Sequence, residues 1–460
     1  MNIIILGAGK VGSHLTNELS LQDHNILVID HNKEVLNRLL EQNDVMAIVG
    51  DGRNVDVLEE ANVGNCDLFI ALTMSDDVNL IASSLAKSLG AKNIIIRLRD
   101  PKYVNHFDRI QDVTNSSLII NPEFLAAKEI QRSIKYSHAR NVQSFLEDKA
   151  LMTEITISKN SKLAGKSLIE ANSYLRQFDI IIGIVNGKGN ITIPKGNFTL
   201  ESGDKVYIMG TKEGIDKFYK AEIPESIRIK DILIIGASSI TRQLTSLLLE
   251  RNFNVTIIEI NKEKAIDIQE QFSDAIVINA DGSDPDILQE VRIDTFDALV
   301  SLTGIDEENI LIALMAEHYG IEKIIAKVNR TNLLKITGIL DIDATFTPKT
   351  AASNYINRLI RSKENAKDIS TLNNLYKLEE DQVEVLEFQV NEQSKLFNHK
   401  LKDLNIKQDT LVAIIEHHEN SGAIEVATGE SIIDMGDRVL LITKSKNITE
   451  IDDILVWVWI

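Results

Sequence analysis

Three glycines near the start of the chain stand where an apolar run of strand length gives way to a helical pattern. Gly7, Gly9 and Gly12 form the sequence GAGKVG, which matches the pattern GxGxxG. In that setting the first glycine permits a tight turn, the second leaves room for an approaching group, and the third lets the helix pack closely on the strand. The helix N-terminus adds unpaired N–H groups and a positive dipole end. The pattern therefore predicts a site for the pyrophosphate of a dinucleotide.

An acidic residue follows at the distance at which such a unit holds a ribose. Asp30 ends a second apolar run, eighteen residues after Gly12, and a carboxylate there accepts both ribose hydroxyls. Its charge would repel a 2′-phosphate by roughly 1 kcal/mol at about 4 Å in water, which favours NAD(H) over NADP(H). ATP or ADP could use the same contacts, and a glycine-rich turn that binds nothing is the other alternative.

Residues after other apolar runs extend this site, because ligands of open α/β sheets lie beyond the carboxyl ends of the strands. Asp51 follows the third run, Thr73 and Met74 follow the fourth, and Arg97 ends the fifth. Thr73 could donate a hydrogen bond to phosphate or ribose, and Arg97 could pair with a phosphate. Each of these residues could equally be an ordinary loop residue.

The chain repeats this arrangement in its second half. The sequence NIIILGAGKVGSHL aligns with DILIIGASSITRQL, and DLFIALTMSDDVNLIAS aligns with DALVSLTGIDEENILIA, at offsets of 229 and 230 residues. One loop insertion explains the change of offset. The sequence therefore consists of two homologous halves, since a repeat of this length is not a solenoid unit.

The second turn has lost two of its three glycines. Gly236 remains, but Ser238 puts a Cβ and a hydroxyl where phosphate would press on the backbone, and Thr241 puts a branched side chain between helix and strand. Glu259 keeps a carboxylate at the ribose position, and Lys327 replaces the arginine. A serine can still donate a hydrogen bond to phosphate. We therefore expect a second site that is weaker, altered or empty.

The elements that must position these residues alternate regularly. Apolar runs at residues 3–6, 26–29, 46–49, 68–72, 94–98 and 118–120 alternate with helical patterns, which indicates a parallel sheet covered on both faces. After about residue 140, short strands separated by Gly, Asn and Asp turns indicate a small α+β module with mostly antiparallel strands, and the second half repeats it. We predict an α/β chain with two Rossmann-type doubly wound parallel-sheet domains at residues 1–138 and 229–365. Each is followed by a small α+β domain, at 139–222 and 370–460, and the polar stretch around Pro224 is the predicted linker between the halves.

The composition excludes several classes of protein. The net charge of −19 argues against general affinity for nucleic acid or an anionic lipid surface. No apolar stretch approaches the roughly 20 residues of a membrane span, and the N-terminus lacks the features of a signal peptide. The single cysteine, Cys66, rules out a disulfide framework and favours a reducing cytoplasm.

No constellation of catalytic residues accompanies the predicted nucleotide site. A dehydrogenase needs an acid/base pair facing the nicotinamide, and the small modules contain no obvious one. Cys66 has no nearby histidine in the sequence, and His417 and His418 are poor joint metal ligands because adjacent strand residues point to opposite faces. Nucleotide binding without visible chemistry favours a sensor. An NAD-dependent dehydrogenase with an unfamiliar substrate domain remains the alternative; a redox-sensing transcriptional regulator would need a DNA-binding helix pair and a basic face, and we see neither.

These motifs together resemble a known family. The GAGKVG turn, Asp30, the sequence GDG at Gly50, the run ALTMSDDVNLIA and the SGDKV module are similar to the regulatory subunits of Trk-type potassium-uptake systems, and more broadly to the RCK (regulator of potassium conductance) family. The similarity covers essentially the whole chain, including its duplicated order.

The resemblance implies a cytoplasmic, non-enzymatic regulator, peripheral on the inner face of the membrane. Such a subunit binds NAD(H), ATP or ADP, forms a homo-oligomeric ring and docks on a membrane-embedded potassium transporter subunit. The segments after Asn121-Pro122 and Thr347-Pro348 each start with a proline break and then run apolar at helical spacing, so we interpret them as candidate hinge or dimer helices. The contacts that the resemblance implies in the first half are Gly7, Ala8, Gly9, Lys10, Val11, Asp30, Thr73, Met74 and Arg97, and the sequence pattern itself adds Gly12 and Asp51. The second implied set, which the lost glycines put in doubt, is Gly236 to Ile240 (with Ser238, Ser239 and Ile240), Glu259, Thr303, Gly304 and Lys327, and the repeat adds Asp281 as the counterpart of Asp51.

Overall fold

The computed structural model contains four sheets, two of six strands and two of five. It describes residues 1–456 except 23, 101–102, 104–106, 115, 117, 137–139, 188, 223–228, 331–332, 334–343, 366–371, 379–381, 393, 419–421, 446–447 and 449. The chain divides into two compact units, one made of residues 1–131 and 230–357 and the other of residues 132–229 and 358–460. Each unit thus combines one segment from each half of the sequence.

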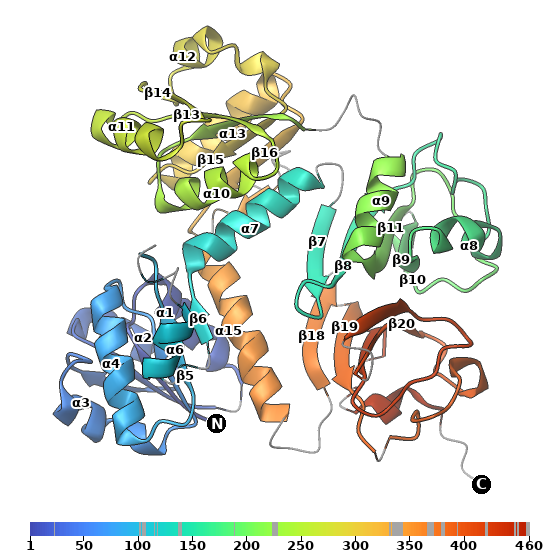
Figure 1. The fold of residues 1–460 in the computed structure, drawn as a ribbon, viewed down its shortest axis with the longest axis horizontal. Helices are drawn as coiled ribbons and strands as arrows, with labels where there is room; N and C mark the ends of the chain where they lie inside the picture. The colour runs from blue at the N-terminus through green and yellow to red at the C-terminus, as the bar shows by residue number, and fades with distance from the viewer. Residues whose placement is uncertain are drawn as a thin grey trace. The chain divides into compact units, whose positions relative to one another are not determined.

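The first unit contains two Rossmann-type sheets, and the first of them forms from the N-terminal apolar runs (Figure 1). Its strands are parallel and run in the order β3-β2-β1-β4-β5-β6. Successive residues Ile3, Ile4 and Ile5 are all buried, so both faces of the central strand are covered. The elements are β1 (Asn2–Leu6), α1 (Lys10–Leu19), β2 (Asn25–Asp30), α2 (Lys33–Gln42), β3 (Met46–Val49), α3 (Val55–Glu60), β4 (Leu68–Ala71), α4 (Asp76–Leu89), β5 (Ile94–Arg97), α6 (Phe107–Thr114), β6 (Leu118–Ile120) and α7 (Pro122–Lys135).

The second Rossmann-type sheet has the same parallel order, β14-β13-β12-β15-β16-β17. In both sheets the second and third strands lie on one side of the first strand, and the later strands lie on its other side. Doubly wound folds bind their ligands at the point where the strand order reverses in this way. The elements are β12 (Asp231–Ile235), α10 (Ser239–Leu249), β13 (Asn254–Ile258), α11 (Lys262–Gln271), β14 (Ile276–Ile278), α12 (Pro285–Glu290), β15 (Ala298–Ser301), α13 (Asp306–His318), β16 (Lys323–Lys327), β17 (Ala344–Phe346) and α15 (Pro348–Asn365).

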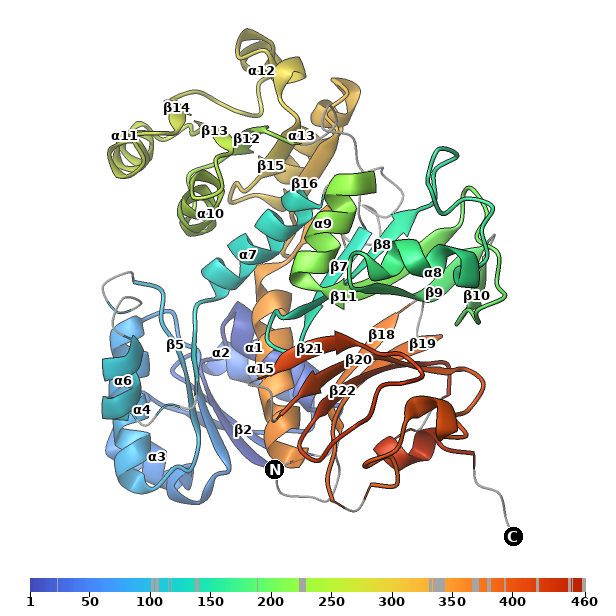
Figure 2. The same cartoon turned by 45° about the vertical axis from the view of Figure 1, so that its right-hand side comes forward.

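The helices that follow the two proline breaks connect the Rossmann-type domains. The side-chain amide of Gln131 on α7 donates to the carbonyl of Leu247 on α10, at 2.6 Å. In return, Asn357 on α15 donates to Glu18 on α1, at 2.8 Å, and α15 and α1 lie side by side in Figure 2. Each of these helices therefore leaves its own domain and contacts the first helix of the other.

The second unit contains two small antiparallel sheets. Their orders are β10-β9-β11-β8-β7 and β18-β19-β22-β20-β21, which correspond strand for strand when one is reversed. Buried residues of both sheets, including Met152 and Tyr207 from one and Val385 and Leu440 from the other, form one common core. The elements are β7 (Arg140–Phe145), β8 (Ala150–Thr156), α8 (Leu168–Arg176), β9 (Ile180–Gly187), β10 (Asn190–Thr192), β11 (Lys205–Thr211), α9 (Lys212–Glu222), β18 (Leu372–Leu378), β19 (Val383–Gln389), β20 (Thr410–His417), β21 (Ala423–Val426) and β22 (Arg438–Thr443).

The predicted fold class is confirmed: two Rossmann-type domains alternate along the chain with two small α+β domains. The sequence pattern missed β7, β18 and helix α9, each of which extends a small domain. The exact domain boundaries stay a prediction, and most of the predicted linker lies outside the described residues. None of the helices in the described part of the chain combines the length and apolar character that a membrane span requires.

Candidate functional site

The first glycine turn has the geometry that its sequence predicts. Gly7 has a φ of +104°, and its N–H donates to the carbonyl of Ile29 on the neighbouring strand at 2.8 Å. A Cβ on Gly12 would lie 1.9 Å from the carbonyl oxygen of Gly7, so the helix and the turn approach too closely for any other residue. A Cβ on Gly9, in contrast, would meet nothing within 4 Å. The second glycine therefore serves no packing purpose within the chain and leaves open space above the backbone.

The N-terminus of α1 is open at the same place. Gly9 is its N-cap residue and no side chain caps the helix; the first hydrogen bond within the helix runs from Ser13 N–H to the Gly9 carbonyl. The N–H groups before it are the ones that a helix leaves unpaired, and they carry the positive end of the helix dipole. This arrangement suits a phosphate.

The carboxylate of Asp30 lies beside this turn. One of its oxygens accepts the N–H of Ala8 at 2.6 Å and the other accepts the N–H of Asn32 at 2.8 Å. The Nδ1 of His31, an exposed side chain, lies 3.2 Å from the same oxygen that accepts from Asn32. A carboxylate has about four acceptor positions, so three partners leave one for a ribose hydroxyl, and a second becomes available if His31 moves. Asp30 thus ties the end of β2 to the phosphate turn.

A buried asparagine that sequence reasoning missed organises the ends of β4 and β5. The side-chain oxygen of Asn79 on α4 accepts the N–H and the hydroxyl of Thr73, at 2.9 and 2.7 Å. Its NH2 group donates to the carbonyls of Thr73 and Arg97, at 3.1 and 3.0 Å. All four hydrogen-bonding positions of the amide are used, and the residue is fully buried. Asn79 therefore fixes the two strand ends that carry predicted site residues.

Besides Thr73, whose hydroxyl donates to Asn79, three more predicted residues of the first site have partners within the chain. Arg97 is buried and its guanidinium lies 2.9 Å from the carboxylate of Glu123, at the start of α7. Asp51 is held by Arg53 at 2.6 Å, and the hydrogen bond from this side chain lowers the pKa of Asp51 to about 2. The sulfur of Met74 is 3.6 Å from the Arg97 guanidinium. Arg97 thus meets a carboxylate in this state and not an open space.

The second turn is closed by its own side chains. The Ser238 hydroxyl accepts the N–H of Thr241, and the Thr241 hydroxyl accepts the N–H of Ser238 at 3.1 Å, which forms a capping box at α10. The Thr241 hydroxyl also contacts the carbonyl of Gly236, at 2.5 Å. Two helix N–H groups that the first turn leaves open are therefore satisfied here.

Other parts of the second site copy the first. Glu259 accepts the N–H groups of Ala237 and Asn261, at 2.5 and 2.7 Å, as Asp30 does in the first half. Asn309 occupies the place of Asn79: its oxygen accepts the Thr303 N–H at 2.8 Å and its NH2 group donates to the Lys327 carbonyl at 3.0 Å. The scaffold of the second domain is therefore intact, and its phosphate turn is the part that differs.

Lys327 and Asp281 have distinct surroundings. Lys327 is buried, and burial lowers the pKa of its ammonium group, an effect to which the nearby charge of Lys10 adds. Asp281 accepts the N–H and hydroxyl of Ser283, at 2.9 and 2.7 Å, as a local turn.

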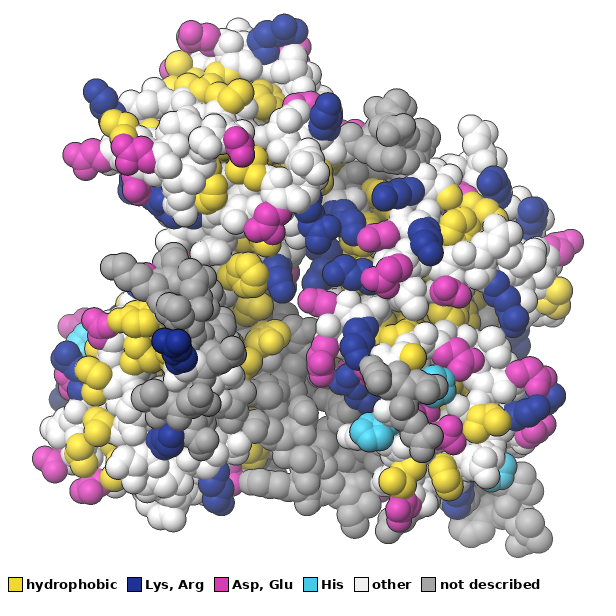
Figure 3. All heavy atoms as spheres, viewed as in Figure 1, with side chains coloured by type: hydrophobic (Ala, Val, Ile, Leu, Met, Phe, Trp, Pro, Cys, Tyr) yellow, Lys and Arg dark blue, Asp and Glu magenta, His cyan; other side chains and the backbone are white. Residues whose placement is uncertain are grey.

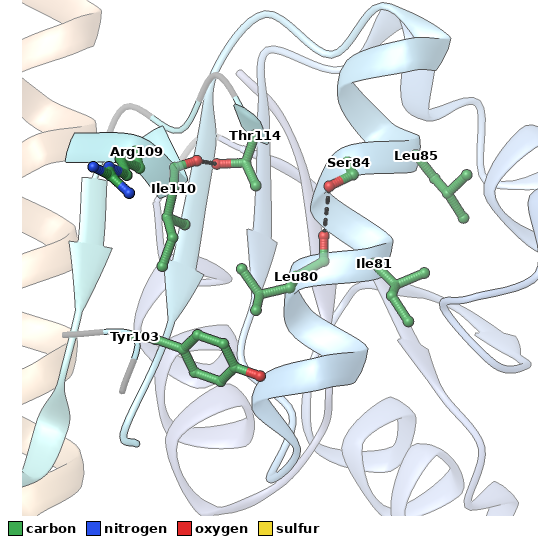
Figure 4. Close-up of a pocket in the computed structure, with 8 residues that line it drawn as sticks. All are labelled: Leu80, Ile81, Ser84, Leu85, Tyr103, Arg109, Ile110 and Thr114. Atoms are coloured by element: carbon green, nitrogen blue, oxygen red, sulfur yellow. Dashed lines mark hydrogen bonds between the residues drawn. The ribbon is translucent and has the colours of Figure 1, made fainter. Parts of the chain in front are cut away.

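A separate cavity of about 460 Å³ lies between α4 and α6 (Figure 4). It is lined mainly by apolar side chains, with the hydroxyls of Ser84 and Thr114 bonded back to their own helices. Its lining residues are Leu80, Ile81, Ser84, Leu85, Tyr103, Arg109, Ile110 and Thr114. None of them belongs to the predicted nucleotide site.

The described residues contain no group of three His, Cys, Asp or Glu side chains that could hold a metal ion. Cys66 is buried, and burial raises the pKa of its thiol to about 11, as an inert core cysteine requires.

Comparison with known proteins places the same four segments in two domain families. The TrkA-N domain matches residues 3–119 and 232–348, and the TrkA-C domain matches residues 152–222 and 385–456. A Trk system potassium uptake protein TrkA homolog of Archaeoglobus fulgidus is 30% identical over 99% of this chain and 100% of its own length. The Trk system potassium uptake protein TrkA of Vibrio alginolyticus is 26% identical over 97% of this chain and 96% of its own.

Solved structures share the fold. The GsuK channel bound to NAD superposes with a TM-score of 0.64 at 19% identity, covering 97% of this chain and 77% of that chain. The GsuK RCK domain superposes with a TM-score of 0.62 at 19% identity, covering 97% and 92%.

Proposed function

Since the chain belongs to the family of TrkA-N and TrkA-C domain proteins that includes the Trk system potassium uptake proteins TrkA, we propose that it is a nucleotide-sensing regulatory subunit of a Trk-type potassium transporter. The resemblance seen in the sequence is confirmed at the level of the family. The chain acts by binding and not by catalysis. It forms a homo-oligomeric ring on the cytoplasmic face of the membrane and docks there on the transporter subunit.

The observation that carries the proposal is the contrast between the two phosphate turns. The first has an uncapped helix, open space above Gly9 and the carboxylate of Asp30 beside the turn. The second is closed by Ser238 and Thr241. We propose that NAD(H), or ATP or ADP through its adenosine half, binds at Gly7, Ala8, Gly9, Lys10, Val11, Gly12 and Asp30, with Thr73 at the rim.

The helix that starts at this turn offers a route for a signal. Its residues His14 and Glu18 contact Thr350 and Asn357 of α15, which belongs to the second Rossmann-type domain. A phosphate bound at the N-terminus of α1 acts on a helix that is already coupled to the other half of the chain. A nucleotide shifts transport only if its affinity differs between two states of the ring. We propose that these two states differ in the contact between α1 and α15.

The proposal is tested by potassium uptake in a strain that lacks the protein. Wild type restores uptake, whereas Gly9→Asp does not, because a carboxylate at this position fills the open space and repels phosphate. Ser238→Asp is the matched control at the closed turn and restores uptake. Undiminished uptake in the strain without the protein would overturn the transport role.

Nucleotide binding is measured on the same purified variants by titration calorimetry. Wild type and Ser238→Asp bind NADH or ATP, and Gly9→Asp does not. Binding by Gly9→Asp with wild-type affinity would refute the site even if the transport role stands.

A further inference from the structure

One histidine of the second small domain lies between two carboxylates. His417 ends β20, its Nδ1 lies 3.0 Å from Asp437, and its Nε2 lies 2.9 Å from Glu425 on β21. Asp437 is almost completely buried, and the side chain of His417 is 20% exposed. Histidine side chains are visible over this domain in Figure 3. Both ring nitrogens are therefore engaged by groups that accept hydrogen bonds.

This geometry specifies the charge state of the ring. A neutral imidazole has one N–H and one lone pair, and only the imidazolium has two N–H groups. With a carboxylate at each nitrogen, the neutral ring would direct its lone pair at a negative oxygen. Both ring nitrogens can donate a hydrogen bond to a carboxylate only when His417 is protonated.

The carboxylates connect the ring to the surrounding backbone. Asp437 also accepts the N–H groups of His418 and Asp434, both at 2.9 Å, and so holds the turn before β22. Glu425 also accepts the hydroxyl of Ser431. The ring thus joins the end of β20, the edge strand β21 and the turn at residues 434–437.

The first small domain lacks this arrangement. Gly187 ends β9 at the place of His417, and the paired strand β10 has Thr192 where β21 has Glu425. Asp204 remains, and a Cβ on Gly187 would lie 3.0 Å from its carboxylate oxygen. The two copies therefore share the aspartate, and the second copy alone has the histidine and the second carboxylate.

We propose that His417, Asp437 and Glu425 form a proton-dependent clasp, which holds the β20–β21 edge and the 434–437 turn together and releases them as the pH rises. Burial opposes the charge on the ring, but the two carboxylates outweigh it and raise the pKa of His417 above its ordinary value of 6.5. The clasp is complete below that value and is lost as the pH rises through the pKa of the folded state.

The other charged groups around the clasp either lie on the opposite face of the strand or adjoin the ring through their backbone. Glu416 precedes His417 on β20, points to the other face of the strand and pairs with Arg438 and Lys149. His418 and Asp434 adjoin the ring through their backbone N–H groups, which donate to Asp437. A regulator of cation uptake with such a clasp would respond to the pH of its compartment; that consequence rests on the proposed function, whereas the titration of His417 does not.

The test is an NMR titration of the full chain with 13C-labelled histidine, together with the melting temperature at pH 6 and pH 9. We expect the resonance that disappears in His417→Gln to titrate above 6.5 in wild type. We also expect His417→Gln to lower the melting temperature at pH 6 and to have little effect at pH 9. His399→Gln, at an exposed histidine outside the clasp, is the control and leaves the pH dependence of wild type unchanged.

Two results would overturn the proposal: titration of His417 at or below 6.5, or an equal loss of melting temperature at both pH values. Glu425→Gln supplies a second test, because this side chain is 40% exposed and its loss disturbs the fold least. We expect this variant to lower the titration point of His417. An unchanged titration point would show that Glu425 does not hold the ring.

Discussion

At the scale of single residues, the difference between the two halves is concentrated at Gly9 and Ser238. Each is the N-cap residue of the helix that follows the turn. A Cβ at Gly9 would meet no atom of the chain within 4 Å. The Ser238 hydroxyl, in contrast, accepts a helix N–H that would otherwise be available to donate to a phosphate. The same backbone position therefore caps the helix in the second half, and in the first half we propose that it admits a ligand.

We predict that Gly9→Ser converts the first turn into the closed type. Glycine and serine differ by only a few tenths of a kcal/mol as N-caps, so the free energy of unfolding should change by no more than that. The affinity for NADH or ATP should fall at least tenfold, which corresponds to about 1.4 kcal/mol. Calorimetry and urea unfolding measure the two quantities separately, and unaltered affinity would contradict the prediction.

Asn79 leads to a prediction in which stability changes together with nucleotide affinity. Asn79→Ala leaves the part-buried N–H of Thr73 and the buried carbonyl of Arg97 without their partner. Such a loss costs about 1–3 kcal/mol for each buried group left unpaired. We expect urea unfolding to report a loss of this order, and nucleotide affinity to fall as the strand ends move. Asn65→Ala, at an exposed position, serves as the comparison.

The sequence predicted the glycine turn and Asp30 correctly in geometry, because local backbone constraints determine both. It did not predict that Arg97 would pair with Glu123, since that contact depends on where α7 begins relative to β5. The role of Asn79 could not be inferred either, because a single polar residue in a helical pattern gives no sign of its partners. Its recurrence at Asn309, in register with the repeat, was the available signal.

At the scale of elements, α10 depends on its own side chains where α1 does not. Ser238→Ala removes the cap of α10, and we expect a cost of about 1 kcal/mol in the unfolding free energy. Gly9→Ala should cost a few tenths of a kcal/mol less, because glycine is the weaker N-cap and α1 has no side-chain cap to lose. Chemical denaturation of both variants tests this difference, and equal destabilisation would contradict the self-capped turn.

The strands β7 and β18 show where sequence patterns fail. The segment Arg140–Phe145 is rich in polar residues and lacks a clear alternation, so nothing local indicates a strand. Both strands lie at sheet edges and form by pairing with β8 and β19. Their structure is thus imposed by backbone hydrogen bonds to a neighbour. The central strands, by contrast, were predicted because burial on both faces demands continuous apolar runs.

At the scale of the whole molecule, the two small domains are held together by charge as well as by their common core. The buried carboxylate of Glu416 accepts from Arg438 and from Lys149 of the other small domain, each at 2.5 Å. We expect Glu416→Gln to destabilise this unit by about 1.5–3 kcal/mol, the range for a hydrogen bond to a charged group. Thermal unfolding measures this loss, and the exposed Glu392→Gln is a control.

The same carboxylate predicts a dependence on acid. Burial alone would raise the pKa of Glu416, but the hydrogen bonds from Arg438 and Lys149 outweigh it and lower the pKa below 4.5. The stabilisation is therefore present above that value and is lost as the pH falls through the pKa of the folded state. We expect the difference in melting temperature between wild type and Glu416→Gln to shrink over that acidic range. A difference that stays constant with pH would show that the ion pairs contribute nothing.

The duplication finally predicts how many nucleotides one chain binds. Both halves keep the sheet, the acidic residue after the second strand and the buried asparagine, so the second half retains the scaffold of the first site. Only the first turn keeps an open helix end, and we expect calorimetry to give one nucleotide per chain. Asp30→Ala should abolish this binding, whereas Glu259→Ala should leave both stoichiometry and affinity unchanged. Two bound nucleotides would mean that phosphate displaces the Ser238 and Thr241 hydroxyls, and the capping box would then be a competitor of the ligand and not its replacement.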